Sequence, residues 1–335
     1  MANYIKTSEL SEKYRLSGID TVNQKTLITN LSDSEQSKDL TLPFNCNGFG
    51  RIRHFNRATT NGFTPNSLPL DPAQNALNLP FEDLVKVQLF QNAVCSWRCW
   101  YCFVDFKLLA ANPKHSHFLS ADELLDLYQS EEEQYSIIDL SGGQPDLVPE
   151  WSLWFADSLS KRGLGKSTYL WSDDNLSNDF LWKFLKKSEI KRLAENKNYG
   201  RVGCFKGFDP ESFSFNTTSD PLLFNQQFRI MKRLIDTGFD MYGYITLTTP
   251  NEDKIEEKIS NFMDKVQLEI HSNFPLRIIP LQIFEFTPTK SRMRVEHYKS
   301  LELQRIAALA WDTEIAKRFS QNDIQKRIFE HNILS

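Results

Sequence analysis

The chain has 335 residues, with 39 basic and 43 acidic side chains, a formal net charge of −4 and a hydrophobic fraction of 40%. This composition excludes a disordered chain, and the slightly acidic balance gives no reason to expect duplex nucleic acid as a partner. No apolar run reaches the roughly 18 residues that a membrane span needs, and residues 1–11 lack the apolar core of a signal peptide, so we expect a cytoplasmic protein without a membrane partner.

The first 80 residues are rich in Ser, Thr, Asn and Pro and show no sustained apolar period. Five prolines lie between Pro43 and Pro80, which favours irregular backbone. The same stretch carries apolar side chains that need burial, among them Leu42, Phe44, Phe49, Phe63, Leu68, Leu70, Leu77, Leu79 and Phe81. We therefore predict a largely irregular N-terminal extension over residues 1–80 that packs on the main domain.

Strand and helix patterns alternate from residue 81 onward. Mostly apolar segments predict six strands, at residues 84–90, 136–140, 168–171, 201–205, 241–247 and 276–286. Helix signals, including a Ser120/Glu123 capping box, predict helices at 120–134, 150–162, 178–195, 220–237 and 252–270. This order predicts an α/β fold whose parallel sheet is wound open or curled into part of a barrel. We expect a core over residues 81–290 and a C-terminal helical extension over residues 291–335.

The five cysteines decide which chemistry to expect. Three of them, Cys95, Cys99 and Cys102, fall within eight residues, directly after the first predicted strand. An odd, clustered set argues against a disulfide framework and favours a metal or redox site. Thiolates bind iron and zinc well, so a zinc site completed by His115 or His117 is one alternative, and three unrelated buried thiols are another.

The spacing C-x3-C-x2-C, with Tyr101 just before the last cysteine, resembles that of the radical SAM superfamily. The resemblance implies a partial (β/α)6 barrel of the radical SAM type with N- and C-terminal extensions. It also implies that Cys95, Cys99 and Cys102 bind three irons of a [4Fe-4S] cluster. The fourth iron is then open to the amino and carboxylate groups of S-adenosylmethionine, and Tyr101 lies near the adenine.

A second segment agrees with this resemblance. Ser141–Pro145 follows the second predicted strand, where the family carries a Gly-Gly-Glu-Pro-like segment. Gly142 and Gly143 let the backbone approach a ligand closely, and the resemblance implies that they contact the methionine ammonium. Gln144 stands where Glu is usual, and the resemblance implies that it too is a cofactor-binding residue, although without a carboxylate. A tight strand-to-helix turn is the alternative interpretation of this segment.

Other candidates follow the third and fourth strands. Ser172 and Asp173 resemble family residues that bond ribose hydroxyls, although they also fit a helix N-cap cluster. Cys204-Phe205-Lys206 resembles the Asp-x-Lys of glycyl-radical-enzyme activases, with Cys204 in place of Asp. There Lys206 would pair with the methionine carboxylate, unless it is an ordinary loop lysine.

The C-terminal ends of the parallel strands, here called the rim, are where such folds carry their chemistry. By position alone, Thr246, Thr248 and Glu285 at the ends of the fifth and sixth strands are further candidates at this rim. The basic loop from Lys290 to Arg294 is expected to be solvated surface.

The resemblance implies reductive cleavage of S-adenosylmethionine to a 5'-deoxyadenosyl radical, with an electron donor such as flavodoxin or ferredoxin. A small-molecule or nucleotide substrate is favoured, because the Pro43–Pro80 stretch is expected to cross the rim and close the site. An activase-like enzyme acting on a partner polypeptide is the alternative, and a non-enzymatic zinc or iron-sulfur protein is the competing class.

Overall fold

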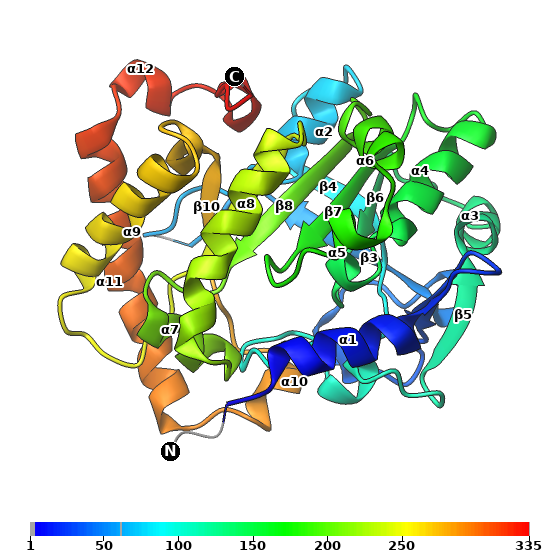
Figure 1. Ribbon diagram of the computed structural model, residues 1–335, viewed down its shortest axis with the longest axis horizontal. Helices are drawn as coiled ribbons and strands as arrows, with labels where there is room; N and C mark the ends of the chain where they lie inside the picture. The colour runs from blue at the N-terminus through cyan, green and yellow to red at the C-terminus, as the bar shows by residue number, and fades with distance from the viewer. Residues whose placement is uncertain (1–3, 61, 335) are drawn as a thin grey trace.

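Six parallel strands and one antiparallel strand form the central sheet of the computed structural model, which describes residues 4–60 and 62–334 (Figure 1). The strand order is β10-β9-β8-β7-β6-β4-β3. The parallel strands are β4 (Leu84–Phe90), β6 (Ile137–Leu140), β7 (Tyr169–Asp174), β8 (Tyr199–Phe205), β9 (Met241–Thr246) and β10 (Ile278–Leu281). β3 (Gly50–Asn56) pairs with β4 in antiparallel register. The α/β class and the partial barrel are confirmed, and each predicted strand has its counterpart, although β10 is shorter than residues 276–286.

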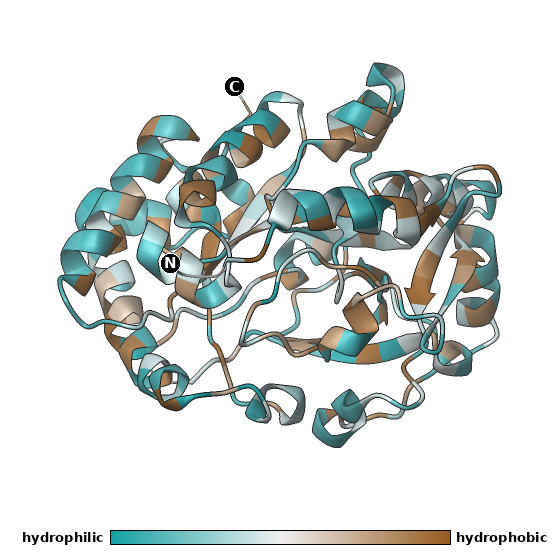
Figure 2. Cartoon of the chain, turned by 60° about the horizontal axis from the view of Figure 1, so that its bottom comes forward, coloured by the Kyte–Doolittle hydropathy of each residue, from teal (hydrophilic) through white to brown (hydrophobic). Residues whose placement is uncertain are grey.

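Helices cover the outer face of the curled sheet and present hydrophobic residues to it (Figure 2). They are α3 (Ala121–Gln129), α4 (Glu150–Lys161), α5 (Phe180–Phe184), α6 (Lys187–Ala194), α7 (Pro210–Thr217), α8 (Gln226–Asp236), α9 (Ile255–Glu269) and α11 (Val295–Arg318). The Ser120/Glu123 capping box is present. The predicted helix 178–195 is divided into α5 and α6, and α7 was not predicted.

The N-terminal region contains more regular structure than the sequence predicts. Its elements are α1 (Thr7–Gly18), β1 (Ile19–Asp20), β2 (Lys25–Thr29), the short helices Glu35–Asp39 and Cys46–Gly48, β3 and α2 (Leu70–Ala76). β2 pairs with β1 and with β5 (Ser116–Ser120) in a small antiparallel sheet. β2 and β3 pair with strands distant in the sequence, β5 and β4, so their local pattern is weak. Residues 1–3 and 61 of the predicted extension lie outside the described residues.

The residues around α2 lie at the bottom of the barrel, the end at which the parallel strands begin, whereas Thr60 bonds Gln282, just after the C-terminal end of β10. β3 runs from Gly50, opposite the C-terminal end of β4, to Asn56, opposite its N-terminal end. Leu68 and Leu70 are fully buried, in a core cluster with residues from the N-terminal ends of the strands, such as Tyr169. The expectation that the whole Pro43–Pro80 stretch crosses the rim is therefore wrong, because the antiparallel pairing carries the chain to the opposite end.

The C-terminal residues pack at the same end. α12 (Gln321–Ile324) and the short helix Ile328–Glu330 follow α11, and Arg327 bonds Asp71 of α2 at 3.2 Å. In Figure 1 α2 and the C-terminus lie at the top, whereas α1 and α10 (Thr287–Lys290) lie at the bottom of the view. Within the described residues no helix is both long and apolar enough for a membrane crossing.

The bottom packing gives a stability prediction. Leu70→Ala should lower the free energy of unfolding by about 2–5 kcal/mol, because it opens a cavity in the inner core. Leu16→Ala, at an 81% exposed position of α1, is the matched control and should change it by less than about 0.5 kcal/mol. Urea denaturation measures both. Equal effects would show that α2 is not part of the barrel core.

Candidate active site

The loop that carries the three cysteines follows β4 at the rim and is fixed by its own backbone contacts. The amide of Cys95 donates to the carbonyl of Leu109 at 3.1 Å. Arg98 donates to the carbonyls of Cys95 and Trp97, both at 2.7 Å, and to the hydroxyl of Tyr14 on α1 at 2.8 Å. These bonds fold the loop back on itself and dock it against α1, so the positions of the thiols are set before any metal binds.

Asn216 on α7 connects the cysteine loop to two strand ends. Its side-chain oxygen accepts from the Trp100 indole at 3.1 Å, and its backbone carbonyl accepts from the Trp100 amide at 3.2 Å. Its amide nitrogen donates to the carbonyls of Lys206 and Thr248, at 2.8 and 3.0 Å. A single buried amide therefore holds the cysteine loop and the loops after β8 and β9 together. Thr248, a rim candidate by position, also donates its hydroxyl to the Asn216 side chain at 2.6 Å.

The basic loop after β10 differs from the expected solvated surface at one residue. Arg292 is partly buried, donates to the carbonyls of Cys102 and Val104, and lies 4.2 Å from the ring centre of Phe106. Lys290 is exposed and pairs with Glu285 at 3.0 Å. Arg292 thus stabilises the cysteine loop. Its position in a basic run of the sequence gave no sign of this role.

Gln144 is completely buried, and every polar atom of its side chain has a partner. Its oxygen accepts from the amide and the hydroxyl of Ser96, both at 2.8 Å. Its nitrogen donates to Asp146 at 2.9 Å and to Ser177 at 2.6 Å. The residue that replaces the family's Glu therefore binds the cysteine loop to the turn after β6.

An acidic group explains why an amide suits this position. Burial, together with the nearby charge of Asp174, raises the pKa of Asp146 to about 6. Asp174 forms a buried ion pair with Arg201, whose Nε lies 3.0 Å away. A carboxylate at position 144 would lose the donor that Asp146 needs and would face its charge.

The two glycines bring the turn after β6 against the end of β4. Gly142 has a φ of +76°, and a Cβ on Gly143 would lie 1.8 Å from the side-chain oxygen of Asn92. Nearby, the buried side-chain oxygen of Gln91 and side-chain nitrogen of Asn92 have no hydrogen-bond partner in the part of the chain that the structure describes. The turn formed by Gly142 and Gly143 thus lies beside one buried acceptor, of Gln91, and one buried donor, of Asn92. This arrangement fits a ligand that carries both hydrogen-bond donors and acceptors.

Tyr101 and Lys206 lie with the cysteines on the inner side of the rim. The Tyr101 hydroxyl is 3.0 Å from the Thr246 hydroxyl. Burial alone would lower the pKa of Lys206, but the acidic groups of Tyr101, Cys204 and Cys99 raise it well above its usual value. The Lys206 ammonium is buried and has no hydrogen bond or ion pair to any described residue, so it is ready for a ligand anion.

The remaining predicted residues divide between the two faces of β7. Asp173 accepts from the Ser141 hydroxyl at 2.6 Å, and burial raises its pKa. Ser172, its neighbour on the opposite face, lies 2.6 Å from the Tyr199 hydroxyl and is not brought to the rim site.

The thiols fit an iron-sulfur cluster better than one zinc ion. Burial raises the pKa of Cys95 and of Cys99, and Cys102 adds to the increase for both, so the three lie close enough to interact. Yet within residues 4–60 and 62–334 no three His, Cys, Asp or Glu side chains can share one metal ion. A four-iron cluster binds each thiolate at a different iron, so the three thiolates need not converge on a single metal ion. His115 and His117 lie at the small antiparallel sheet, and the Cys3His zinc alternative is not supported.

Sequence reasoning missed the side chains that β3 and β6 contribute to the interior below this rim. They are Arg51 and Arg53 of β3 and Asp139 of β6. The alternation of Arg51, Arg53 and Phe55 was the available signal, since side chains two apart share a face of a strand.

The comparisons with known proteins come from solved structures. No protein-family model matches the chain, and no curated protein sequence does. Streptococcus suis SuiB bound to S-adenosylmethionine is similar with a TM-score of 0.41 and 18% identity, over 60% of this chain and 41% of that chain. SuiB bound to precursor peptide SuiA gives 0.38 and 17%, over 55% and 36%. The chain thus spans less than half the length of SuiB.

Gln144→Glu tests the amide's role. We expect a loss of about 2 kcal/mol or more in unfolding free energy at about pH 8, and a smaller loss at about pH 5. The pKa of Asp146 is raised on folding, so the folded state binds more protons and acid relieves the paired carboxylates. Urea denaturation at both pH values measures this. Gln325→Glu, at an exposed position, is the control, and an equal effect there would contradict the assignment.

Proposed function

We propose that this protein is a radical SAM enzyme, in which Cys95, Cys99 and Cys102 hold a [4Fe-4S] cluster beside S-adenosylmethionine. The observation that supports it best is the placement of three thiols on one braced loop at the C-terminal end of the first parallel strand. When bound, the cluster and S-adenosylmethionine supply a 5'-deoxyadenosyl radical, which abstracts hydrogen from a substrate carbon. An electron donor such as flavodoxin or ferredoxin belongs to this proposal.

The chain's own residues bind and orient the cofactor in this proposal. Lys206 offers a buried, unpaired ammonium to the methionine carboxylate. Gly142 and Gly143 bring their backbone to the methionine ammonium. Tyr101, held by Thr246, lines the adenine side. Asp173 offers a carboxylate to ribose hydroxyls, whereas Gln144 positions the cysteine loop and makes no cofactor contact.

Two substrate classes fit this reaction, a small molecule or nucleotide and a partner polypeptide. The preference for a small molecule or nucleotide depended on a rim covered by the Pro43–Pro80 stretch. Leu68 and Leu70 pack at the bottom instead, whereas Thr60 bonds Gln282, just after the C-terminal end of β10. At rim level, Asp39 accepts from the amide and hydroxyl of Thr287, at 2.9 and 3.0 Å, and so connects the chain ahead of β3 to the chain after β10. These contacts join the two edges of the sheet, which supports a small molecule or nucleotide as the substrate, and a partner polypeptide remains the alternative.

Cysteine replacement tests the ligand assignment. After anaerobic reconstitution, the wild type should be brown and should form 5'-deoxyadenosine from S-adenosylmethionine under reduction. Cys99→Ser should lose both the colour and the product, because a three-thiolate cluster has no spare ligand. Cys46→Ser, which alters a thiol outside the loop, should keep both. A colourless wild type that holds stoichiometric zinc would contradict the proposal.

Lys206→Met tests the cofactor contact separately. The variant should keep the iron-sulfur colour but bind S-adenosylmethionine at least about tenfold more weakly, since a charge-assisted hydrogen bond is lost. Equilibrium binding to the oxidised, reconstituted protein measures this without turnover. Lys166→Met, at an exposed position, is the control. Unchanged affinity in Lys206→Met would remove Lys206 from the cofactor site.

A further inference from the structure

Below the cofactor residues, the inner face of the sheet carries charged side chains that the proposed function does not use. Arg51 of β3, Leu89 of β4 and Asp139 of β6 occupy one row across the sheet, because the pairing registers join Arg51 to Leu89 and Leu89 to Asp139. Arg53 lies on the same face, two residues along β3. We call Arg51, Arg53 and Asp139 the inner charged cluster.

Two members of the inner charged cluster, Arg51 and Asp139, are buried and poorly paired, whereas Arg53 is partly exposed. Asp139 is fully buried, and neither of its carboxylate oxygens has a hydrogen-bond partner among the described residues. The nearest cation is Arg53, whose Nη1 lies 3.7 Å from one oxygen. Arg51 is 5% exposed, and its side chain makes no hydrogen bond or ion pair within the described chain, its buried Nε included.

Burying the side chains of Arg51 and Asp139 without hydrogen-bond partners destabilises the folded state, because burial disfavours their charged forms. Burial, with the like charge of Arg53, lowers the pKa of Arg51 to about 9. Burial, with the like charge of Asp173, raises the pKa of Asp139 to about 8. A ligand with an oxyanion for Arg51 and an N–H or O–H donor for Asp139 satisfies both groups at once.

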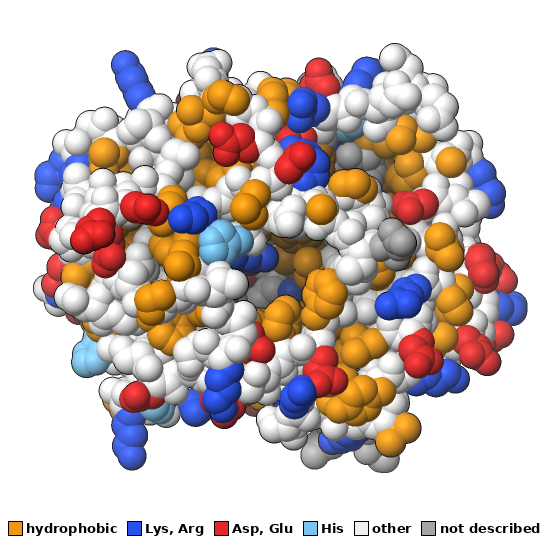
Figure 3. Space-filling view, turned by 180° about the vertical axis from the view of Figure 1, so that it is seen from behind, with side chains coloured by type: hydrophobic (Ala, Val, Ile, Leu, Met, Phe, Trp, Pro, Cys, Tyr) orange, Lys and Arg blue, Asp and Glu red, His pale blue; other side chains and the backbone are white. Residues whose placement is uncertain are grey.

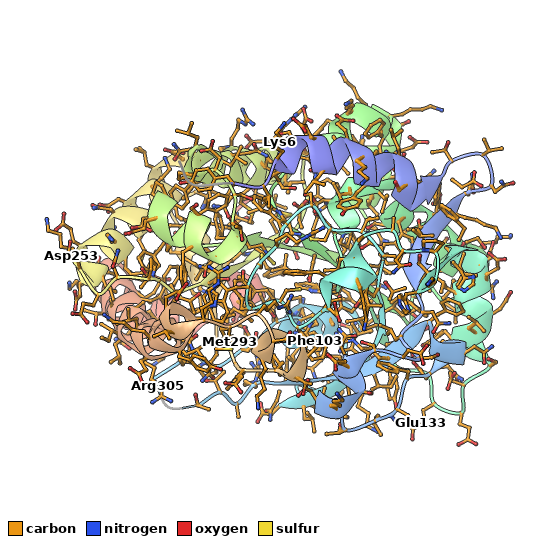
Figure 4. All side chains as sticks on the ribbon, turned by 90° about the horizontal axis from the view of Figure 1, so that it is seen from below. Lys6, Phe103, Glu133, Asp253, Met293 and Arg305 are labelled. Carbon is orange, nitrogen blue, oxygen red and sulfur yellow. The ribbon has the colours of Figure 1, made fainter. Side chains whose placement is uncertain are left out.

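The inner charged cluster is next to the cysteine loop. The guanidinium of Arg51 lies over the ring of Phe103, 5.0 Å from its centre, and Phe103 directly follows Cys102. Viewed from the rim end, Phe103 lies near the middle of the molecule (Figure 4). From behind, the surface is hollowed near its centre, with basic and hydrophobic side chains in the hollow (Figure 3).

We propose that the inner charged cluster is the substrate-binding site, and that the substrate presents a carboxylate or phosphate to Arg51 and a neighbouring hydrogen-bond donor to Asp139. The word substrate depends on the proposed function, whereas the ligand chemistry depends on Arg51 and Asp139 alone. The adjacency to Phe103 places such a ligand beside the residues that hold the cofactor.

The test is an anion titration followed by thermal unfolding, with inorganic phosphate and acetate as probes and chloride keeping the ionic strength constant. Each probe is titrated into the protein before and after cluster reconstitution, with and without saturating S-adenosylmethionine. We expect a saturable rise in Tm with at least one anion in all of these states. Response to phosphate alone assigns a phosphorylated substrate, and response to acetate assigns a carboxylate.

Variants locate the site. Arg51→Gln should weaken the anion's apparent Kd at least about tenfold. Asp139→Asn should fold stably, because it removes a buried, unbonded carboxyl group, and should bind the anion at least as tightly as the wild type. Arg305→Gln changes an exposed arginine labelled far from Phe103 in Figure 4, and should leave the titration unchanged.

Three outcomes overturn the proposal: no saturable response to either anion, full affinity in Arg51→Gln, or weaker anion binding in Asp139→Asn. Loss of the response with S-adenosylmethionine present also overturns it, because Arg51 would then serve the cofactor carboxylate. Anion binding without any cluster formation would contradict the proposed function while leaving the ligand chemistry of the inner charged cluster supported.

Discussion

The antiparallel pairing of β3 with β4 determines how both ends of the barrel are built. It extends the parallel sheet by one strand and places Arg51 and Arg53 on the face that the barrel encloses. Its direction also carries the chain from the rim to the bottom, where Leu68 and Leu70 fill the inner core. A parallel strand at this edge would have put the charged side chains and the apolar segment at exchanged ends.

Mostly apolar segments were sufficient to predict the six parallel strands and the rim on which the cysteines lie. They are buried on both faces, so their composition alone identifies them. β3 escaped prediction because its two faces meet different surroundings and its partner β4 lies in a separate, later segment. α7 was missed for a related reason: Pro210–Thr217 has little amphipathic character, and its role depends on Asn216 reaching three other loops.

The site shows the same division. The spacing of Cys95, Cys99 and Cys102 was sufficient to propose them as a ligand set, because a short loop places them together whatever the rest of the chain does. The groups that hold this loop, Tyr14, Asn216 and Arg292, come from both ends and the middle of the chain. Each looked ordinary in sequence, since a hydrogen bond across a fold leaves no local pattern.

Gln144 has a consequence for how this sequence can vary. Its amide joins Ser96 of the cysteine loop to Asp146, and Asp146 in turn bonds the amide of Asn175 at 3.1 Å. A step to Glu at position 144 is therefore expected to lower stability while position 146 is acidic, and a prior step to Asn at position 146 should reduce that loss. The two positions form an epistatic pair, so the order in which substitutions arise, and not their separate merits, decides which variants of this turn are reachable.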